Sequence, residues 1–271
     1  MKNLKIALVA CSCLVMACKD SDKKKEGLPM DEAQVSASIA PPASEVSSTP
    51  VKIIPIEHAS AVLEWGGVTV YIDPVGGAAA FAGQKHPDLI LITDIHGDHF
   101  SLETLQQLNT SNAKIMMPQA VADLMPEAFA PDIDVLNNGD GKERNGINVE
   151  AIPMYNLREE AKDFHTKGRG NGYVLSINGE RIYFSGDTED IPEMRSLKNI
   201  DKAFICMNLP YTMTEESAAA AVLEFKPKQV YPYHYRGRPD VSDVTKFKTL
   251  VNAGDPKIEV VQLDWYPKEN Y

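Results

Sequence analysis

Residues 88–100 read DLILITDIHGDHF. The first half is an apolar run typical of a strand buried on both faces. The second half carries two histidines and two aspartates, where a rigid scaffold often places functional groups. Alternate side chains of an extended segment point the same way, so Asp94, His96 and Asp98 are expected on one side, with His99 brought round by a bend. Because imidazoles and carboxylates suit zinc, iron or manganese, the stretch predicts a metal site rather than a solvated polar loop.

Strand and helix signals alternate around this stretch from residue 51 onward. Gly66-Gly67 and Asn178-Gly179 mark hairpin turns. Both halves of the region begin with hairpins and continue with alternating helices and strands. This order predicts an α/β (α+β) fold, a four-layer αββα sandwich with two sheets face to face and helices outside. The strands are expected at 51–57, 61–65, 68–74, 88–94, 114–118, 149–155, 172–177, 181–187, 203–209, 229–235 and 259–265.

Capping residues predict where the helices begin. Ser101 can cap one helix. The capping box from Thr212 to Glu215 predicts a second, which must end before Pro227. A third helix is expected to begin at Ser242 and to end at Gly254.

The N-terminus differs in composition from the rest of the chain. Residues 1–17 have a basic start and a short apolar run, which is typical of a signal peptide, with an uncleaved anchor as the alternative. VMAC at 15–18 resembles a bacterial lipobox, so Cys18 is expected to carry a lipid. Residues 18–50 are rich in charge, Ser, Ala and Pro and predict a flexible linker, which leaves 51–271 as the folded domain. We therefore expect a protein tethered by its N-terminal lipid to a membrane of the bacterial cell envelope.

Charge and cysteine content narrow the classes of partner. The formal net charge is -11, and without a basic stripe this argues against nucleic acid as a partner. A small molecule, anionic if nearby arginines bind it, is the expected partner in solution. Once Cys18 is acylated and the signal is removed, Cys206 is the remaining thiol, so no intramolecular disulfide is expected.

A family resemblance covers nearly all of 51–271. Asp94-x-His96-x-Asp98-His99 resembles the motif HxHxDH of the metallo-β-lactamase-fold hydrolases, with the first histidine replaced. The chain looks most similar to the branch that contains L-ascorbate-6-phosphate lactonase. Further matches in the right order are His58 in EHAS, Asp73 in YIDPV, His165 in FHTKGRGNGY, Asp187 in FSGDT and His234 in YPYHY.

The resemblance implies a centre of two divalent metal ions, with zinc expected first and manganese or iron as alternatives. It implies one metal held by Asp94, His96 and His165, and a second held by Asp98, His99 and His234, with Asp187 bridging the two. It also implies that Asp73 orients the metal-binding loop, although capping a turn is an equal alternative. His58 would line the pocket or donate a proton, or would be a buried structural histidine.

Asp94 is where the chain departs from the family motif. An aspartate is shorter, harder and more anionic than histidine, so it should favour manganese or iron relative to zinc. It can also fail to reach the metal. Three outcomes stay open: a working two-metal site, a one-metal hydrolase, and a metal site without catalysis.

The function expected is metal-dependent hydrolysis of an ester, lactone or phosphodiester by a metal-bound hydroxide. Asp98, Asp187 and His58 are the expected catalytic residues. Arg169 and Arg236, which follow two of the histidines, are expected to bind an anionic group, with solvated loop charges as the alternative. The rival functions are a non-catalytic, metal-dependent anion-binding surface lipoprotein and a lipid phosphodiesterase of the same fold.

Overall fold

The computed structural model describes residues 50–267. The predicted signal peptide, Cys18 and nearly all of the predicted linker lie outside this range. Within it, no helix combines the length and the apolar character needed to cross a membrane.

The first sheet contains the stretch at 88–100 and is mixed. Its strand order follows the sequence, β1-β2-β3-β4-β5-β6. The hairpins β1–β2 and β2–β3 are antiparallel, whereas β3 to β6 pair in parallel. The strands are β1 (Lys52–Glu57), β2 (Ser60–Trp65), β3 (Val68–Ile72), β4 (Leu89–Leu91), β5 (Lys114–Met117) and β6 (Ile133–Val135).

The second sheet repeats this plan, in the order β13-β12-β11-β10-β9-β8-β7. An antiparallel meander from β7 to β10 is followed by parallel pairing from β10 to β13. The strands are β7 (Gly141–Arg144), β8 (Ile147–Met154), β9 (Gly170–Ile177), β10 (Glu180–Phe184), β11 (Lys202–Cys206), β12 (Gln229–Tyr233) and β13 (Glu259–Val260).

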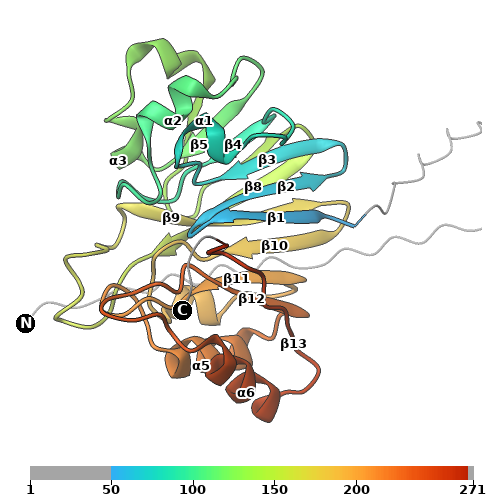
Figure 1. Cartoon of the computed structure of the whole chain (residues 1–271), viewed down its shortest axis with the longest axis vertical. Coiled ribbons are helices and arrows are strands. Elements are labelled where there is room, and N and C mark those ends of the chain that lie inside the picture. Colours follow the sequence, from blue (N-terminus) through green and yellow to red (C-terminus); the bar gives the residue numbers. More distant parts are fainter. Residues whose placement is uncertain (1–49, 268–271) are drawn as a thin grey trace, which may run out of the picture. The chain divides into compact units, whose positions relative to one another are not determined.

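Alternating side chains of the first sheet build two hydrophobic layers. Val70 and Ile72 of β3 join the core that also holds residues of β8 to β12, while Tyr71 faces the opposite way. That opposite face is covered by helix residues such as Leu105 and Val121. In Figure 1, α1 to α3 lie on the side of β4 and β5, and α5 and α6 lie beside β11 and β12. The predicted four-layer sandwich of two sheets with flanking helices is therefore confirmed.

Two of the predicted helix caps are wrong, because other hydrogen bonds engage the expected residues. The cap of α5 is Thr214, whose side chain accepts a hydrogen bond from Ser217, while Thr212 bonds to Asn208. The cap of α6 is Asp243, since the Ser242 hydroxyl donates to the Met207 carbonyl. Ser101 does cap α2. The helices are α1 (Gly77–Ala80), α2 (Leu102–Gln107), α3 (Gln119–Ala122), the 3-10 helix η1 (Glu127–Asp132), α4 (Pro192–Arg195), α5 (Glu215–Phe225) and α6 (Val244–Gly254).

Candidate metal centre

The candidate site residues follow the ends of parallel strands. Asp73 follows β3 and residues 94–99 follow β4, its parallel neighbour. In the second sheet Asp187 follows β10 and His234 follows β12, with β11 pairing in parallel between them. The carboxyl ends of parallel strands meet at one edge of a sheet, where open α/β sheets commonly bind ligands. The two halves of the chain thus bring their polar residues together.

The segment at 94–99 is not extended, so the alternation predicted for it is wrong. β4 ends at Leu91, and the next residues form turns in which His99 N and Phe100 N both donate to the His96 carbonyl, at 2.9 and 2.8 Å. The turns separate the side chains that alternation would have placed together. Asp94 lies with His96 and His165, whereas Asp98 lies with His58 and His234.

Asp187 is the central carboxylate of the site. It is 3% exposed, and its Oδ2 lies 3.4 Å from His99 Nε2 and 3.3 Å from His165 Nε2. Its Oδ1 lies 3.4 Å from His234 Nε2 but makes no hydrogen bond to the described residues. A buried carboxylate surrounded by imidazoles from different loops is placed to be shared between two cations.

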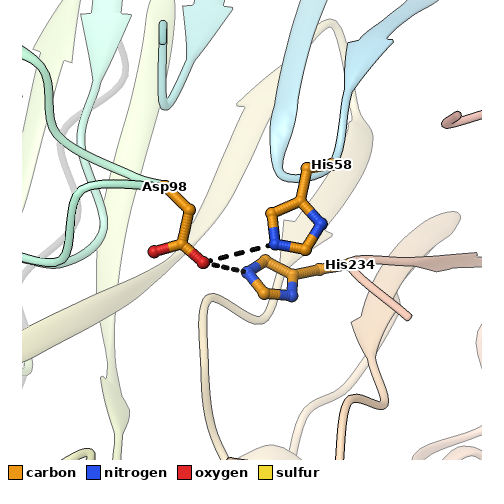
Figure 2. A group of neighbouring side chains, drawn as sticks. All are labelled: His58, Asp98 and His234. Atoms are coloured by element: carbon orange, nitrogen blue, oxygen red, sulfur yellow. Dashed lines mark hydrogen bonds and ion pairs between the residues drawn. The ribbon is translucent and has the colours of Figure 1, made fainter. Parts of the chain in front are cut away.

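Asp98 faces two histidines (Figure 2). Its Oδ2 lies 3.2 Å from His58 Nε2 and 3.4 Å from His234 Nε2. His99 Nε2 lies 3.1 Å from His234 Nε2 and 4.0 Å from Asp98 Oδ1. His234 Nε2 therefore lies close to the donor atoms of Asp98, Asp187 and His99, and it belongs to two of the groups that could hold a metal ion.

These spacings suit a bound metal ion. Four ligands about 2.0–2.1 Å from zinc at the corners of a tetrahedron lie about 3.3 Å from one another. The contacts of Asp187 with three imidazoles, at 3.3 to 3.4 Å, have this spacing. The donors are nitrogen and oxygen atoms in three buried or partly buried groups, two of which share His234 and one of which contains Asp187, an arrangement consistent with a dinuclear metal site. The donor set alone leaves the metal's identity open.

Hydrogen bonds hold the His99 ring in place. Its Nδ1 lies 2.8 Å from Asp73 Oδ2, which leaves Nε2 to face Asp187. Asp73 in turn accepts from Thr93, at 2.7 Å from the backbone N–H and 2.6 Å from the hydroxyl. Such carboxylate–histidine pairs orient metal-binding imidazoles. Asp73 is thus placed to orient His99 and the loop that carries it, and it belongs to none of the groups of described residues that could hold a metal ion.

The backbone is strained at three site residues. His58, Asp73 and His234 have φ values of 57°, 43° and 48°. This left-handed region costs side chains other than glycine of order 1–3 kcal/mol each and is often found at functional sites. Each of the three residues directly follows a strand, at the point where the chain leaves the sheet.

The site's electrostatics set the charge of its donors. Burial raises the pKa of Asp187, but the His234 and His99 imidazoles outweigh it and hold the pKa well below its usual range. Burial likewise opposes ionisation of Asp98, yet hydrogen bonds from His234 and His58 keep its pKa low. Burial and the neighbouring His234 lower the pKa of His58 to about 4. The two carboxylates are therefore ionised and His58 is neutral near pH 7. Burial lowers the pKa of His99, but Asp187 and Asp73 outweigh it and raise that pKa well above its usual value, so a metal ion bound by His99 would displace a proton.

The remaining predicted residues lie at different places. A cavity of about 480 Å³ is lined by His58, His96, Asp98, Phe164, His165, Asp187, Asn208, Tyr211, Arg236, Gly237 and Arg238. Arg236 thus borders the cavity, with its guanidinium 4.9 Å from the Tyr266 ring centre. Arg169 does not line it, because its guanidinium bonds to Asp94 at 3.0 and 3.1 Å.

Sequence reasoning missed Tyr266 at the site. Its hydroxyl lies 2.7 Å from His58 Nδ1 and accepts the backbone N–H of Arg236 at 3.1 Å. The hydroxyl can therefore fix the tautomer of His58, so that Nε2–H donates to Asp98. No local signal in WYPKEN marks this role, since Tyr266 and His58 are 208 positions apart.

Comparison with known proteins agrees with this architecture. The family described as "Beta-lactamase superfamily domain" matches residues 52–234. A UPF0173 metal-dependent hydrolase of Thermococcus onnurineus is 32% identical over 79% of this chain and 96% of its own. One from Pyrococcus abyssi is also 32% identical, with the same coverage.

Solved structures resemble the fold. The crystal structure of a candidate metal-dependent hydrolase from Parabacteroides distasonis is 34% identical, with a TM-score of 0.71 over 80% of this chain and 94% of its own. The metallo hydrolase Igni18 of Ignicoccus hospitalis has a TM-score of 0.67 at 24% identity, covering 79% of this chain and 95% of its own. At that identity it shows the fold alone.

The expected resemblance is confirmed at the level of fold and family, as is the expectation of a metal-dependent enzyme of the hydrolase class. The chain belongs to the metallo-β-lactamase superfamily and, within it, to the UPF0173 metal-dependent hydrolase family.

Proposed function

We propose that this chain hydrolyses an ester, lactone or phosphodiester bond at a dinuclear centre, most readily loaded with zinc. The observation that carries the proposal is the position of Asp187, a buried carboxylate between His99, His165 and His234. Two divalent cations held there would lower the pKa of a water molecule and polarise the bond under attack. The protein residues would hold and orient the water molecule and the substrate.

The cavity beside Asp187 offers binding groups for a substrate. Phe164 and Tyr211 pack edge to face, with ring centres 5.1 Å apart, and form an aromatic wall. The loop with Arg236 and Arg238 forms another part of the lining. Guanidinium groups bind phosphate or carboxylate by paired hydrogen bonds, so they favour an anionic substrate. A phosphorylated lactone, as in the lactonase-like branch that the sequence resembles, would combine a hydrolysable ester bond with an anionic phosphate group.

The arginine loop is fixed beside the aromatic wall. Arg238 N donates to the Leu209 carbonyl at 2.8 Å. A Cβ on Gly237 would lie 2.0 Å from the same carbonyl oxygen, so only glycine permits this close approach. Because Asn208 and Tyr211 flank Leu209 and line the cavity, the two loops hold the binding groups together.

A lipid phosphodiester is the second candidate substrate class. Phe164, which lines the cavity, and Leu209, which contacts Gly237, are both 36% exposed. Exposed apolar side chains at a polar site are suited to the hydrocarbon part of an amphiphile. The proposed N-terminal lipid on Cys18 would keep the chain at an envelope membrane, where such substrates occur.

A hydrolase screen with matched variants tests the function. The full-length chain would be depleted of metal, reloaded with zinc, manganese or iron, and assayed with carboxylic esters, lactones and phosphodiesters. Asp187→Asn is expected to reduce turnover at least about 100-fold, as for loss of a group that organises the centre, with an unchanged circular dichroism spectrum. Turnover that survives both depletion and Asp187→Asn would contradict the proposal.

A second comparison tests how the substrate is bound. Arg236→Gln is expected to raise KM for anionic substrates about 10-fold and to leave neutral ones nearly unchanged. Arg195→Gln is the control, because Arg195 pairs with Asp190 and Glu224 and does not line the cavity. Equal KM changes in the two variants would contradict the role of Arg236 in substrate binding. Binding of anions without any turnover would favour the binding-protein rival.

A further inference from the structure

Asp94 occupies the position that the family motif gives to a histidine, and its carboxylate already has close partners. Oδ1 accepts from Arg169 Nε at 3.1 Å, and Oδ2 accepts from Arg169 Nη2 at 3.0 Å. Oδ2 also lies 2.8 Å from His96 Nδ1. A carboxylate in a two-point contact with a guanidinium is neutralised and held in a fixed plane.

The distance between Asp94 and His96 is that of a hydrogen bond. At 2.8 Å it is shorter than the 3.3 to 3.4 Å that separates Asp187 from its imidazoles. It equals the 2.8 Å between Asp73 Oδ2 and His99 Nδ1. In both pairs a buried carboxylate takes Nδ1, which leaves Nε2 as the ring nitrogen for a metal ion. Asp94 Oδ2 therefore lies at the same distance from a histidine Nδ1 as the orienting carboxylate Asp73 does.

Asp94 and His96 differ in how far their side chains are exposed to solvent. The Asp94 side chain is 0% exposed, whereas that of His96 is 40% exposed. His96 and His165 line the cavity, and Asp94 does not. Asp94 thus lies behind His96 as seen from the space where a metal and a substrate would meet.

The start of β9 brings Arg169 to this position. Asn171 N donates to the Thr93 carbonyl at 2.9 Å, and a Cβ on Gly170 would lie 2.9 Å from the same oxygen. Glycine at 170 therefore allows β9 to lie directly against the residue before Asp94. Arg169 also donates to the Phe164 carbonyl, which ties the Asp94 pair to the loop that carries His165.

We propose that Asp94 is a positioning residue and not a metal ligand: neutralised by Arg169, it accepts the Nδ1 proton of His96 and aims Nε2 at the first metal. This inference rests on the proposed function, since it concerns the same centre. The first metal would then have His96, His165 and the shared Asp187 as protein ligands, whereas the second would have Asp98, His99, His234 and Asp187. Three protein ligands leave an open position for water or substrate, as in catalytic zinc sites.

Metal binding by carboxylate variants tests the inference. In the full-length chain, zinc stoichiometry and affinity would be measured by competition with a chromophoric chelator, together with the visible spectrum of the cobalt form. Asp94→Asn keeps an oxygen that can accept from Nδ1, so both metals should remain, with a loss of affinity below about 10-fold and an unchanged cobalt spectrum. Asp94→Ala should lower affinity at the first site about 10- to 100-fold.

Two reference variants frame these results. His96→Gln, which removes a ligand, should lose the first metal and change the cobalt spectrum. Asp134→Asn removes another carboxylate paired with basic side chains, Lys142 and Arg144, outside the metal-binding groups, and should leave metal binding unchanged. If Asp94→Asn behaves as His96→Gln does, the inference is overturned while the proposed function stands. If the wild type binds no metal, the proposed function itself fails.

A measurement on the wild type keeps the inference testable if an Asp94 variant does not fold. Nitrogen-15 NMR of the zinc-loaded chain, with His96→Gln for assignment, should show His96 bound through Nε2 and protonated on Nδ1. Coordination of His96 through Nδ1 would overturn the inference, because Asp94 could not then accept that proton.

Discussion

Tyr266→Phe is expected to destabilise the protein by removing a single oxygen. The hydroxyl of Tyr266 lies 2.7 Å from His58 Nδ1 and accepts the Arg236 N–H at 3.1 Å, and the residue is only 2% exposed. Phenylalanine keeps the ring and its edge-to-face contact with Tyr235 at 5.0 Å. The substitution therefore isolates the hydrogen bonds from the packing.

The magnitude follows from the buried groups left without this partner. Losing one partner of a buried hydrogen bond costs about 1–3 kcal/mol, so we expect Tyr266→Phe to lose about 2 kcal/mol of unfolding free energy. For a domain of this size that corresponds to about 4–8 °C in Tm. His58 would also lose the contact that fixes its tautomer, so turnover should fall more than substrate binding does.

Tyr183→Phe is the matched control. Tyr183 is fully buried, and no described residue accepts or donates a hydrogen bond at its hydroxyl. Removing an unpaired polar group should change the unfolding free energy by less than about 0.5 kcal/mol or raise it. Urea unfolding of the two variants and the wild type measures the difference. Equal losses in both variants, or none in Tyr266→Phe, would refute the assigned hydrogen-bond network.

Three further predictions concern positions outside the metal centre. Burial and the nearby Asp187 raise the pKa of Cys206 to about 12. In the folded full-length chain at pH 8, Cys206 should therefore not react with a thiol reagent. If the folded wild type consumed more reagent than folded Cys206→Ala, the prediction would be contradicted. Gly172→Ala would place a Cβ 2.8 Å from the Ser185 carbonyl oxygen, and this overpacking should cost about 1–3 kcal/mol of unfolding free energy. Gly141→Ala is the control, because its Cβ would lie 3.7 Å from the Val149 carbonyl oxygen. Equal urea midpoints of the two variants would disprove the steric argument. Thr214→Ala removes the cap of α5 and should cost about 1 kcal/mol in urea unfolding, while Thr214→Ser should be nearly neutral; no loss in the alanine variant would show that the cap is dispensable.

Local patterns predicted the architecture well because they record which faces are buried. The apolar run before Asp94 and the glycines of the two hairpins indicated two sheets with helices outside. β6 and β7 were missed, since IDV and GKER are short and carry no extended apolar alternation. The caps at Thr212 and Ser242 were misassigned because neighbouring residues can cap equally well. Other hydrogen bonds decide between them: Thr212 bonds to Asn208, 4 positions away, and Ser242 bonds to Met207, 35 positions away.

The site was less accessible to sequence reasoning than the fold. Ligand types and their order along the chain indicated a metal centre, but partners distant in sequence set each residue's role. Arg169 bonds to Asp94 across 75 positions, and this contact pairs an arginine that was expected to bind substrate with a buried carboxylate. The turn at 94–99 likewise depends on hydrogen bonds to His96 O that alternation does not foresee.

The most direct test of the metal centre is elemental analysis of metal per chain, on full-length protein purified without chelators or a histidine tag. The wild type should hold close to two divalent ions, with the ion at the three-ligand first site more weakly bound, and Asp187→Asn should lose most of both, because this carboxylate faces His99, His165 and His234 together. A wild type without metal, or an Asp187→Asn variant with undiminished metal content, would contradict the shared-carboxylate centre.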